Sequence, residues 1–305
     1  MASIVESRAA GLSTAVDDTT APAGLPPLGR ALVGEAAGTF LLVLFGTGSV
    51  AAAVLTAAQL GLWQVAVVWG FGVALAIYCS AAASGAHLNP AVSLAFALWR
   101  PDGFPLRRLL PYWGAQLAGA VLAGCAVAAL FGPFITRFEA AKGIVRGAPG
   151  SELSAMIFGD YFPNPALFGT DAAARALVSP AQAALVEAFG TAVLVFVIFA
   201  LTDPANRAAP TAHLVPFFVG FTVASLISLF APLTQAGWNP ARDFGPRLVA
   251  LALGWGAVAV PGPVGGFWAY IAGPLVGGPL GAGLYRWLLS PGPSALGQPD
   301  TTAGE

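Results

Sequence analysis

The tripeptide Asn-Pro-Ala occurs twice in this chain inside apolar sequence, and this repetition restricts the possible fold more than any other feature. The two copies start at Asn89 and Asn239, and 239 − 89 = 150 residues separate them. Asparagine is a preferred helix N-cap, and proline fits the first helical position because its missing N–H needs no partner there. Each copy therefore predicts the start of a helix.

The composition around these helix starts indicates that lipid is the solvent for much of the chain. Only 9% of the residues are charged and 57% are hydrophobic, whereas soluble domains carry about 25% charged residues. So few charges cannot cover a soluble surface. The formal net charge of −1 gives no reason to expect a nucleic-acid partner.

Six apolar stretches have about the 20 residues that a helix needs to cross a ~30 Å hydrocarbon core. They cover residues 31–55, 62–80, 109–131, 181–201, 212–230 and 267–289. The helices that begin at the two Asn-Pro-Ala copies, 89–99 and 239–253, are too short to cross. The pattern predicts an all-α membrane protein, a six-helix bundle with two half-helices.

The order span, span, half-helix, span occurs twice. Glu35-Ala-Ala-Gly-Thr in the first half matches Glu187-Ala-Phe-Gly-Thr in the second, at an offset of 187 − 35 = 152 residues. An odd number of spans in each half means that the halves enter the membrane from opposite sides, as in an inverted repeat. The predicted division is a disordered cytoplasmic tail (1–29), a channel domain (30–290) with repeats at about 31–131 and 181–289 around a long extracellular loop (132–180), and a second cytoplasmic tail (291–305).

Arginines in the short loops and tails set the expected orientation. They are Arg30, Arg100, Arg107, Arg108, Arg207 and Arg286, and all fall on one side of the predicted topology. Cytoplasmic loops carry the excess of Lys and Arg, so both termini are expected in the cytoplasm of a cell whose plasma or inner membrane holds the protein.

Two half-helices that enter from opposite faces should meet N-terminus to N-terminus at the membrane centre. Each N-terminus carries about half a positive charge, and the amides of Asn89 and Asn239 can donate to one passing oxygen. The non-helical residues before them must line a cavity, where their carbonyls form a ladder of acceptors from Gly85, Ala86, His87, Gln235, Ala236 and Gly237. Such a pore suits a neutral molecule with hydroxyl groups and excludes ions.

These loops, Ser-Gly-Ala-His-Leu-Asn-Pro-Ala-Val at 84–92 and Asn-Pro-Ala-Arg-Asp-Phe-Gly-Pro-Arg at 239–247, resemble the signature loops of the major intrinsic proteins, the aquaporin family. Asp243 after Arg242, together with Ile-Val-Arg-Gly at 144–147, resembles the glycerol-facilitator (aquaglyceroporin) branch. The resemblance covers about 31–290. It implies a homotetramer with one pore per subunit and passive conduction of glycerol, other small neutral solutes and water, with a strict water channel as the alternative.

The resemblance also places an outer selectivity constriction at Trp69, Ile227, Ala236 and Arg242. Here the chain departs from the bacterial glycerol facilitators, which have a small residue in place of Ile227 and an aromatic in place of Ala236. The set present here is similar to that of the nodulin-type intrinsic proteins of plants. We expect Arg242 to offer donors on the wall opposite the apolar face of Trp69.

Other polar residues are expected to support the pore. Glu35 and Glu187 should accept N–H groups of the two loops, and Asp243 should favour the dipole of its helix. The alternative for Arg242 is a structural ion pair with Asp243. For His87 two readings stay open: a packed, hydrogen-bonded histidine, or a residue whose carbonyl lines the pore while its ring supports the loop.

Several features are expected to have no chemical role. Cys79 and Cys125 lie in apolar runs and are expected to be buried and inert. A third Asn-Pro-Ala, at Asn164, lies in a Pro/Gly-rich loop and predicts a turn. No metal-ligand spacing and no cofactor motif is found.

Small residues are expected to permit close helix approach within a tetramer; they are Gly119, Gly124, Gly277 and Gly278.

Three rival functions fit the sequence less well. A secondary transporter would need ionisable residues in the spans for coupling, and only Glu35 and Glu187 occur there, both near helix starts. A junction protein that has lost conduction would not need Asn89, Asn239 and Arg242. An enzyme is not expected, because no nucleophile–base pair is found.

Overall fold

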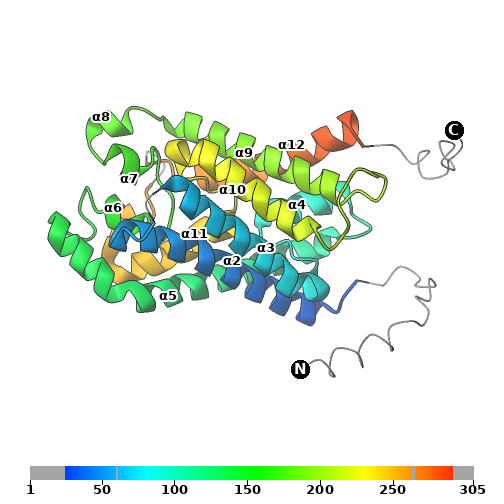
Figure 1. Cartoon of the computed structure of the whole chain (residues 1–305), viewed down its shortest axis with the longest axis horizontal. Helices are drawn as coiled ribbons and strands as arrows, with labels where there is room; N and C mark the ends of the chain where they lie inside the picture. The colour runs from blue at the N-terminus through cyan, green and yellow to red at the C-terminus, as the bar shows by residue number, and fades with distance from the viewer. Residues whose placement is uncertain (1–24, 60, 263–264, 291–305) are drawn as a thin grey trace, which may run out of the picture.

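The computed structural model describes residues 25–59, 61–262 and 265–290, and all regular structure within them is helical. The elements are α2 (Leu28–Thr56), α3 (Leu62–Ser84), α4 (Pro90–Trp99), the short η1 (Leu106–Arg108), α5 (Leu109–Lys142), α6 (Glu152–Ala155), α7 (Pro165–Phe168), α8 (Ala172–Arg175), α9 (Pro180–Leu201), α10 (Val215–Thr234), α11 (Pro240–Ala250), η2 (Leu251–Trp255), η3 (Gly256–Val258) and α12 (Ala269–Leu288). The long helices form an elongated bundle (Figure 1). The predicted all-α class is confirmed. Of the expected tails 1–29 and 291–305, residues 1–24 and 291–305 lie outside the described residues, and α2 already begins at Leu28.

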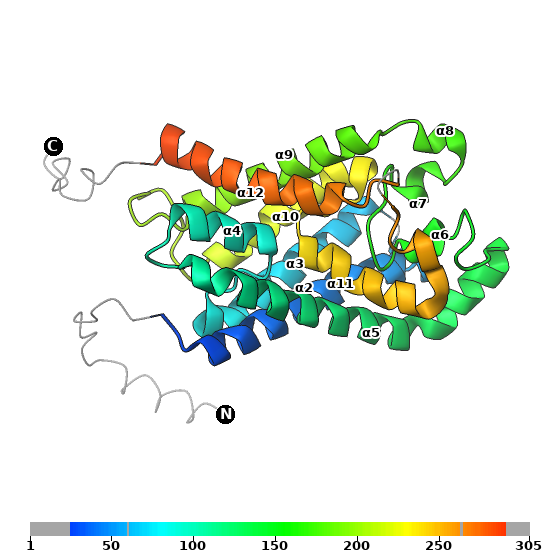
Figure 2. The ribbon, with the colours of Figure 1, turned by 180° about the vertical axis from the view of Figure 1, so that it is seen from behind.

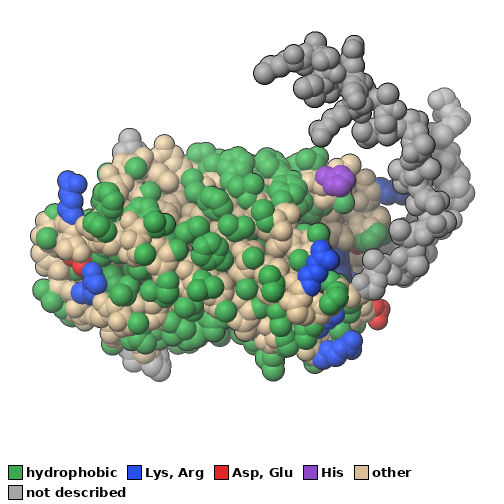
Figure 3. Space-filling model, turned by 90° about the horizontal axis from the view of Figure 1, so that it is seen from below, with side chains coloured by type: hydrophobic (Ala, Val, Ile, Leu, Met, Phe, Trp, Pro, Cys, Tyr) green, Lys and Arg blue, Asp and Glu red, His purple; other side chains and the backbone are tan. Residues whose placement is uncertain are grey.

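The surface of the bundle matches a lipid environment. Five helices are long and apolar enough to cross a membrane: α2, α3, α5 with η1, α9 and α10. α12 is 20 residues long, as α10 is, but its sequence is richer in glycine and contains Arg286. Hydrophobic side chains cover the middle of the molecule, and Lys and Arg side chains lie toward its two ends (Figure 3).

This environment corrects the expectation for the cysteines. Cys79 on α3 and Cys125 on α5 are both exposed on the protein surface, not buried. In a soluble protein an apolar run packs inward, but in a membrane helix the apolar run also covers the face toward lipid. An apolar neighbourhood in sequence therefore does not predict burial in this chain.

The two halves have the same internal packing. α2 packs against α3 and α5, and α9 packs against α10 and α12. Each half-helix packs against the last long helix of the other half, α4 against α12 and α11 against α5. In Figure 2, α4 lies toward the end where α2 begins and α12 ends, and α11 lies toward the opposite end. This is the arrangement predicted for an inverted repeat.

The third long helix exceeds its expected length. The apolar run predicted a helix over 109–131, but α5 continues to Lys142 with Pro133 inside it. The charged residues that end the apolar run, among them Arg137 and Glu139, are not helix breakers, so the helix extends beyond the length of a membrane core. The long loop is therefore 143–179, not 132–180, and it contains α6, α7 and α8.

The third Asn-Pro-Ala is more than a turn. Asn164 caps the four-residue helix α7, and its side-chain oxygen accepts the N–H of Ala166 at 3.0 Å. Its amide nitrogen donates to the carbonyl of Ala231 at 3.2 Å, and its backbone N–H donates to the carbonyl of Pro232 at 3.1 Å. The motif therefore attaches the long loop to the end of α10.

The glycines expected at a subunit interface lie at helix crossings within the chain. A Cβ atom on Gly119 would lie 2.1 Å from the carbonyl oxygen of Ala36, and one on Gly277 would lie 2.0 Å from that of Ala188. A Cβ atom on Gly124 would lie 2.9 Å from the Cα atom of Pro246 on α11, and one on Gly278 would lie 2.7 Å from the carbonyl oxygen of Ala91 on α4. All four glycines therefore permit close helix approach within one chain: Gly119 and Gly277 inside a half, and Gly124 and Gly278 between the halves.

Substitution of one such glycine tests this packing. We expect Gly119→Ala to destabilise the folded protein by about 1–3 kcal/mol, because the added methyl overlaps a backbone oxygen that cannot rotate away. Gly114→Ala in the same helix is the control, because its methyl would meet no described atom within 4 Å; its effect should stay within about 1 kcal/mol and favour the helix. Thermal unfolding of both variants in detergent measures the difference, and equal unfolding temperatures would contradict it.

Candidate functional site: a channel between two half-helices

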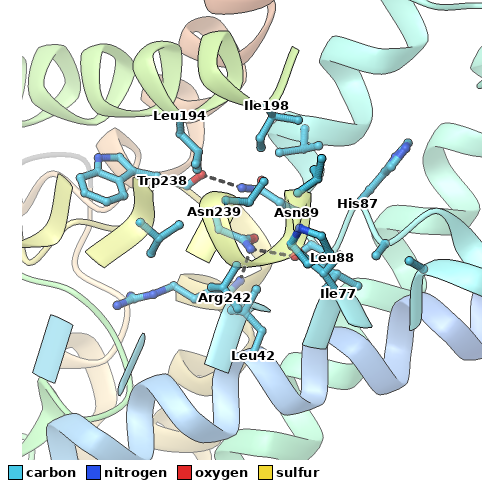
Figure 4. Close-up of a pocket in the computed structure, with 18 of the residues that line it drawn as sticks. Leu42, Ile77, His87, Leu88, Asn89, Leu194, Ile198, Trp238, Asn239 and Arg242 are labelled. Atoms are coloured by element: carbon cyan, nitrogen blue, oxygen red, sulfur yellow. Dashed lines mark hydrogen bonds between the residues drawn. The ribbon is translucent and has the colours of Figure 1, made fainter. Parts of the chain in front are cut away.

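The two asparagine caps meet at the centre of the molecule, and each is bonded to the other half of the chain. The side-chain oxygen of Asn89 accepts the N–H of Ala91 at 2.8 Å, and its amide nitrogen donates to the carbonyl of Trp238 at 2.9 Å. The amide nitrogen of Asn239 donates to the carbonyl of Leu88 at 2.8 Å (Figure 4). An amide nitrogen carries two hydrogens, so each asparagine has one beyond this bond.

The loops before the caps have an uncommon backbone conformation. In the first loop φ is 53° at both Ala86 and Leu88, and in the second it is 68° at Ala236 and 47° at Trp238. Residues other than glycine rarely adopt positive φ, and such a conformation persists only where the surroundings enforce it. Strong interactions must therefore hold both loops.

One buried carboxyl group holds each loop. Glu35 accepts the N–H groups of His87 at 2.9 Å and Leu88 at 2.7 Å. Glu187 accepts those of Gly237 at 3.1 Å and Trp238 at 2.7 Å. Both glutamates are 0% exposed. These are the hydrogen bonds expected from the sequence. They occupy N–H groups on the side of each loop that faces its glutamate, and the carbonyl groups remain available on the opposite side of the loop.

That other side is a cavity of about 270 Å³ lined by both asparagines. Its walls are largely apolar, with side chains from α2, α3, α9 and α10 that include Leu42, Val73, Ile77, Leu194, Ile198, Val219 and Val223. Five of the six residues expected to form the carbonyl ladder line it, namely Gly85, Ala86, His87, Ala236 and Gly237. The sixth, Gln235, lines a second cavity of about 300 Å³.

Three side chains separate the two cavities. Trp69, Ile227 and Arg242 line both of them, so a molecule that moves from one cavity to the other must pass these residues. All three are buried. They are three of the four residues expected at the constriction, and the fourth, Ala236, lines the first cavity only.

The ring of His87 packs away from this path. Its centroid lies 4.7 Å from the ring of Phe96 and 4.4 Å from the ring of Phe104, and its Nδ1 atom lies 3.2 Å from the hydroxyl of Ser93. The ring is thus packed and hydrogen-bonded, which is common to both readings of this residue.

Arg242 is held between an aromatic ring and a carboxylate. Its guanidinium carbon lies 4.4 Å from the centre of the Trp69 ring, so the two side chains are in contact. The sequence instead predicts them on opposite walls of the path. Its guanidinium forms an ion pair with Asp160, a residue of the long loop that was not among the predicted site residues. The carboxylate of Asp243 is 4.0 Å away.

Two other groups lie closer to the Asp243 carboxylate than the guanidinium of Arg242 does. Its carboxylate accepts Nε of Arg247 at 2.8 Å and the backbone N–H of Asp160 at 2.7 Å. The structural ion pair of Arg242 with Asp243, the alternative expected from the sequence, is present at 4.0 Å, but Arg242 pairs more closely with Asp160. Asp243 joins the second half-helix to the long loop.

The long loop is the part of the site that sequence reasoning missed. Besides Asp160, it contributes the N–H of Tyr161, which donates to the side-chain oxygen of Gln235 at 2.8 Å. Asp160 and Ser154 are almost fully buried. Two sequence features lie in this loop, Ile-Val-Arg-Gly at 144–147 and the third Asn-Pro-Ala, but neither indicated Asp160. Among the described residues, no group of three or more His, Cys, Asp or Glu side chains is arranged to hold a metal ion.

The role of the carboxyl groups can be tested through stability. Replacing Glu187 by Gln puts an NH₂ group where one carboxylate oxygen accepts an N–H, so one buried donor of the loop loses its partner. We expect a loss of about 1–3 kcal/mol, measured as a lower unfolding temperature in detergent. Glu152→Gln is the control, because its ion-pair partner Arg175 is half exposed, where such pairs contribute little, and the remaining amide oxygen can still accept the single N–H of Gly150. Equal effects of the two substitutions would contradict this role.

Comparisons with known proteins agree with this geometry. The family model of the major intrinsic proteins matches residues 25–285. The glycerol uptake facilitator protein of Pseudomonas aeruginosa is 44% identical over 273 residues, which are 89% of this chain and 92% of that protein. The propanediol uptake facilitator of Citrobacter freundii is 41% identical over 84% of this chain and 91% of its own length.

A solved structure has the same fold. The X-ray structure of the aquaglyceroporin from Plasmodium falciparum matches with a TM-score of 0.73 at 24% identity, over 87% of this chain and 98% of that one. This likeness covers both halves of the bundle. The family match over 25–285 includes both asparagine caps and the constriction. The chain belongs to the major intrinsic protein family, whose members are membrane channels and not enzymes.

Proposed function

We propose that this chain is a passive channel through which glycerol, other small neutral solutes and water diffuse across a membrane. The observation that carries the proposal is the pair of asparagine amides in one cavity. Asn89 and Asn239 each use one amide hydrogen to bond the opposite loop, and the second hydrogen can be donated to a solute oxygen at the centre of the path.

The chemistry of the cavity favours hydroxyl-bearing carbon chains. Carbonyl groups of the two loops offer acceptors along one side, and apolar side chains of the long helices cover the rest. A linear polyol can place its hydroxyl groups toward the loops and its carbon atoms toward the apolar wall. The printed names of two relatives, a glycerol and a propanediol uptake facilitator, describe solutes of this type.

Passive conduction is favoured over coupled transport. A transporter needs a span carboxylate that can change partners during its cycle. Glu35 and Glu187 are fully buried and bonded to the backbone of the loops, where they are required for the shape of the path. This supports a permanent scaffold in place of an ion-coupling site.

We further propose a homotetramer with one pore in each subunit and both termini in the cytoplasm. Both halves of the chain contribute residues to the wall of each cavity, which supports one path per subunit. Large exposed side chains on α3 and α10, such as Trp63, Phe71 and Phe221, offer an apolar face for a neighbouring subunit or lipid. The orientation follows from the arginines of the short loops.

Stopped-flow light scattering on proteoliposomes tests the proposed function. The wild-type protein should conduct both glycerol and water, without saturation and without an ion gradient. Asn89→Asp or Asn239→Asp removes the donor to the opposite loop and places a carboxylate in the cavity, so glycerol flux should fall by about tenfold or more, which equals about 1.4 kcal/mol. Rapid water flux without glycerol flux in the wild type would assign the protein to the strict water channels instead.

A second substitution tests the proposed constriction. Ala236→Phe adds an aromatic ring to the wall of the cavity beside Ile227 and Arg242, so it should narrow the path and lower glycerol flux several-fold, by about 1 kcal/mol, and lower water flux less. Ala129→Phe is the matched control, because Ala129 is exposed on α5. The same fall in glycerol and water flux, or no change in either, would mean that Ala236 does not face the permeating solute.

A further inference from the structure

A carboxylate of the long loop reaches the constriction of the channel. Asp160 is 2% exposed, lines the second cavity together with Trp69, Ile227 and Arg242, and forms an ion pair with the guanidinium of Arg242. It comes from neither half-helix and from neither repeat. A solute that passes from the second cavity to the first therefore meets a side chain that the repeated architecture does not supply.

The backbone around Asp160 is bonded on both sides, so the position of its carboxylate is set by the protein. Its N–H donates to Asp243 at 2.7 Å, and its carbonyl accepts a hydrogen bond from Arg247. The next N–H, that of Tyr161, donates to the side chain of Gln235. Of the two groups in the ion pair, the flexible one is the long side chain of Arg242, and the rigid one is Asp160.

The ion pair determines where the guanidinium of Arg242 lies and how much charge it presents. The other nearby carboxylate, Asp243, is 4.0 Å away and already accepts Arg247 and the N–H of Asp160. Asp160 is therefore the main counter-charge of Arg242. It holds the guanidinium against the face of Trp69, whereas a guanidinium without this partner could turn its donors toward the passage.

We propose that Asp160 is a specificity-determining residue of the channel, which positions Arg242 on Trp69 and offsets its charge so that polyols can pass. The inference rests on the proposed conduction of glycerol and water. The bulkier solute is the more sensitive to the position of the guanidinium, because a water molecule needs less of the cross-section. Loss of the carboxylate should therefore lower the flux of glycerol more than that of water.

A double-mutant cycle in proteoliposomes tests this. The measured quantity is the ratio of glycerol to water permeability, which does not depend on how much protein the vesicles contain. Asp160→Asn should lower this ratio by about threefold or more, within the range of coupling between contacting residues. In an Arg242→Ala background the same substitution should change the ratio by less than about twofold, because the residue through which Asp160 acts is absent.

Two further variants separate this role from a structural one. Asp160→Glu keeps the negative charge beside Arg242 and should retain a ratio closer to that of the wild type than Asp160→Asn does. Glu152→Gln removes a carboxylate from another part of the same loop, where it pairs with Arg175, and should leave the ratio unchanged.

Distinct outcomes overturn the two proposals. If Asp160→Asn leaves the ratio unchanged, changes it equally in the Arg242→Ala background, or behaves as Asp160→Glu does, Asp160 does not determine specificity through Arg242. If the wild-type protein conducts no glycerol, the proposed function itself is wrong, and the ratio cannot be formed. The wild-type measurement therefore precedes the cycle and separates the two cases.

Discussion

Two helix N-termini that point at each other in an apolar interior are the constraint around which this molecule is built. Each carries about half a positive charge and unpaired N–H groups, so the ends repel one another and need acceptors. The oxygens of Asn89 and Asn239 accept the first N–H groups of their own helices, and their nitrogens bond the opposite loops. The half-helices are thereby joined, and polar amides remain at the centre of the path.

This arrangement requires loops that are costly to form. Several residues without the freedom of glycine have positive φ, and each such residue costs on the order of 1 kcal/mol or more. Glu35 and Glu187 offset that cost by accepting two consecutive N–H groups each. Because these bonds occupy the N–H groups, the carbonyl groups of the loops stay available as acceptors, so the feature that stabilises each loop also supports the proposed polar side of the path.

Sequence reasoning succeeded where local chemistry or the repeat determines structure. The caps at Asn89 and Asn239 follow from residue preferences, and the equivalence of Glu35 and Glu187 follows from a single offset. It failed where contacts are long-range and unrepeated. The ion pair of Asp160 joins residues 82 positions apart, and nothing near Asp160 in sequence indicates it. The exposed cysteines and the length of α5 were missed because an apolar run reports contact with lipid, not burial or the end of a helix.

The asymmetry of the two halves explains why the proposed constriction lies on one side of the asparagine pair. Three residues after each asparagine, the first half-helix has Val92 and the second has Arg242, and both line the same cavity. A repeat alone would give a path with equal ends. The charge of Arg242 breaks this symmetry, and a buried charge requires a partner. Asp160 is that partner, and the loop that carries it connects the two halves, so the connection between the repeats provides what neither repeat contains.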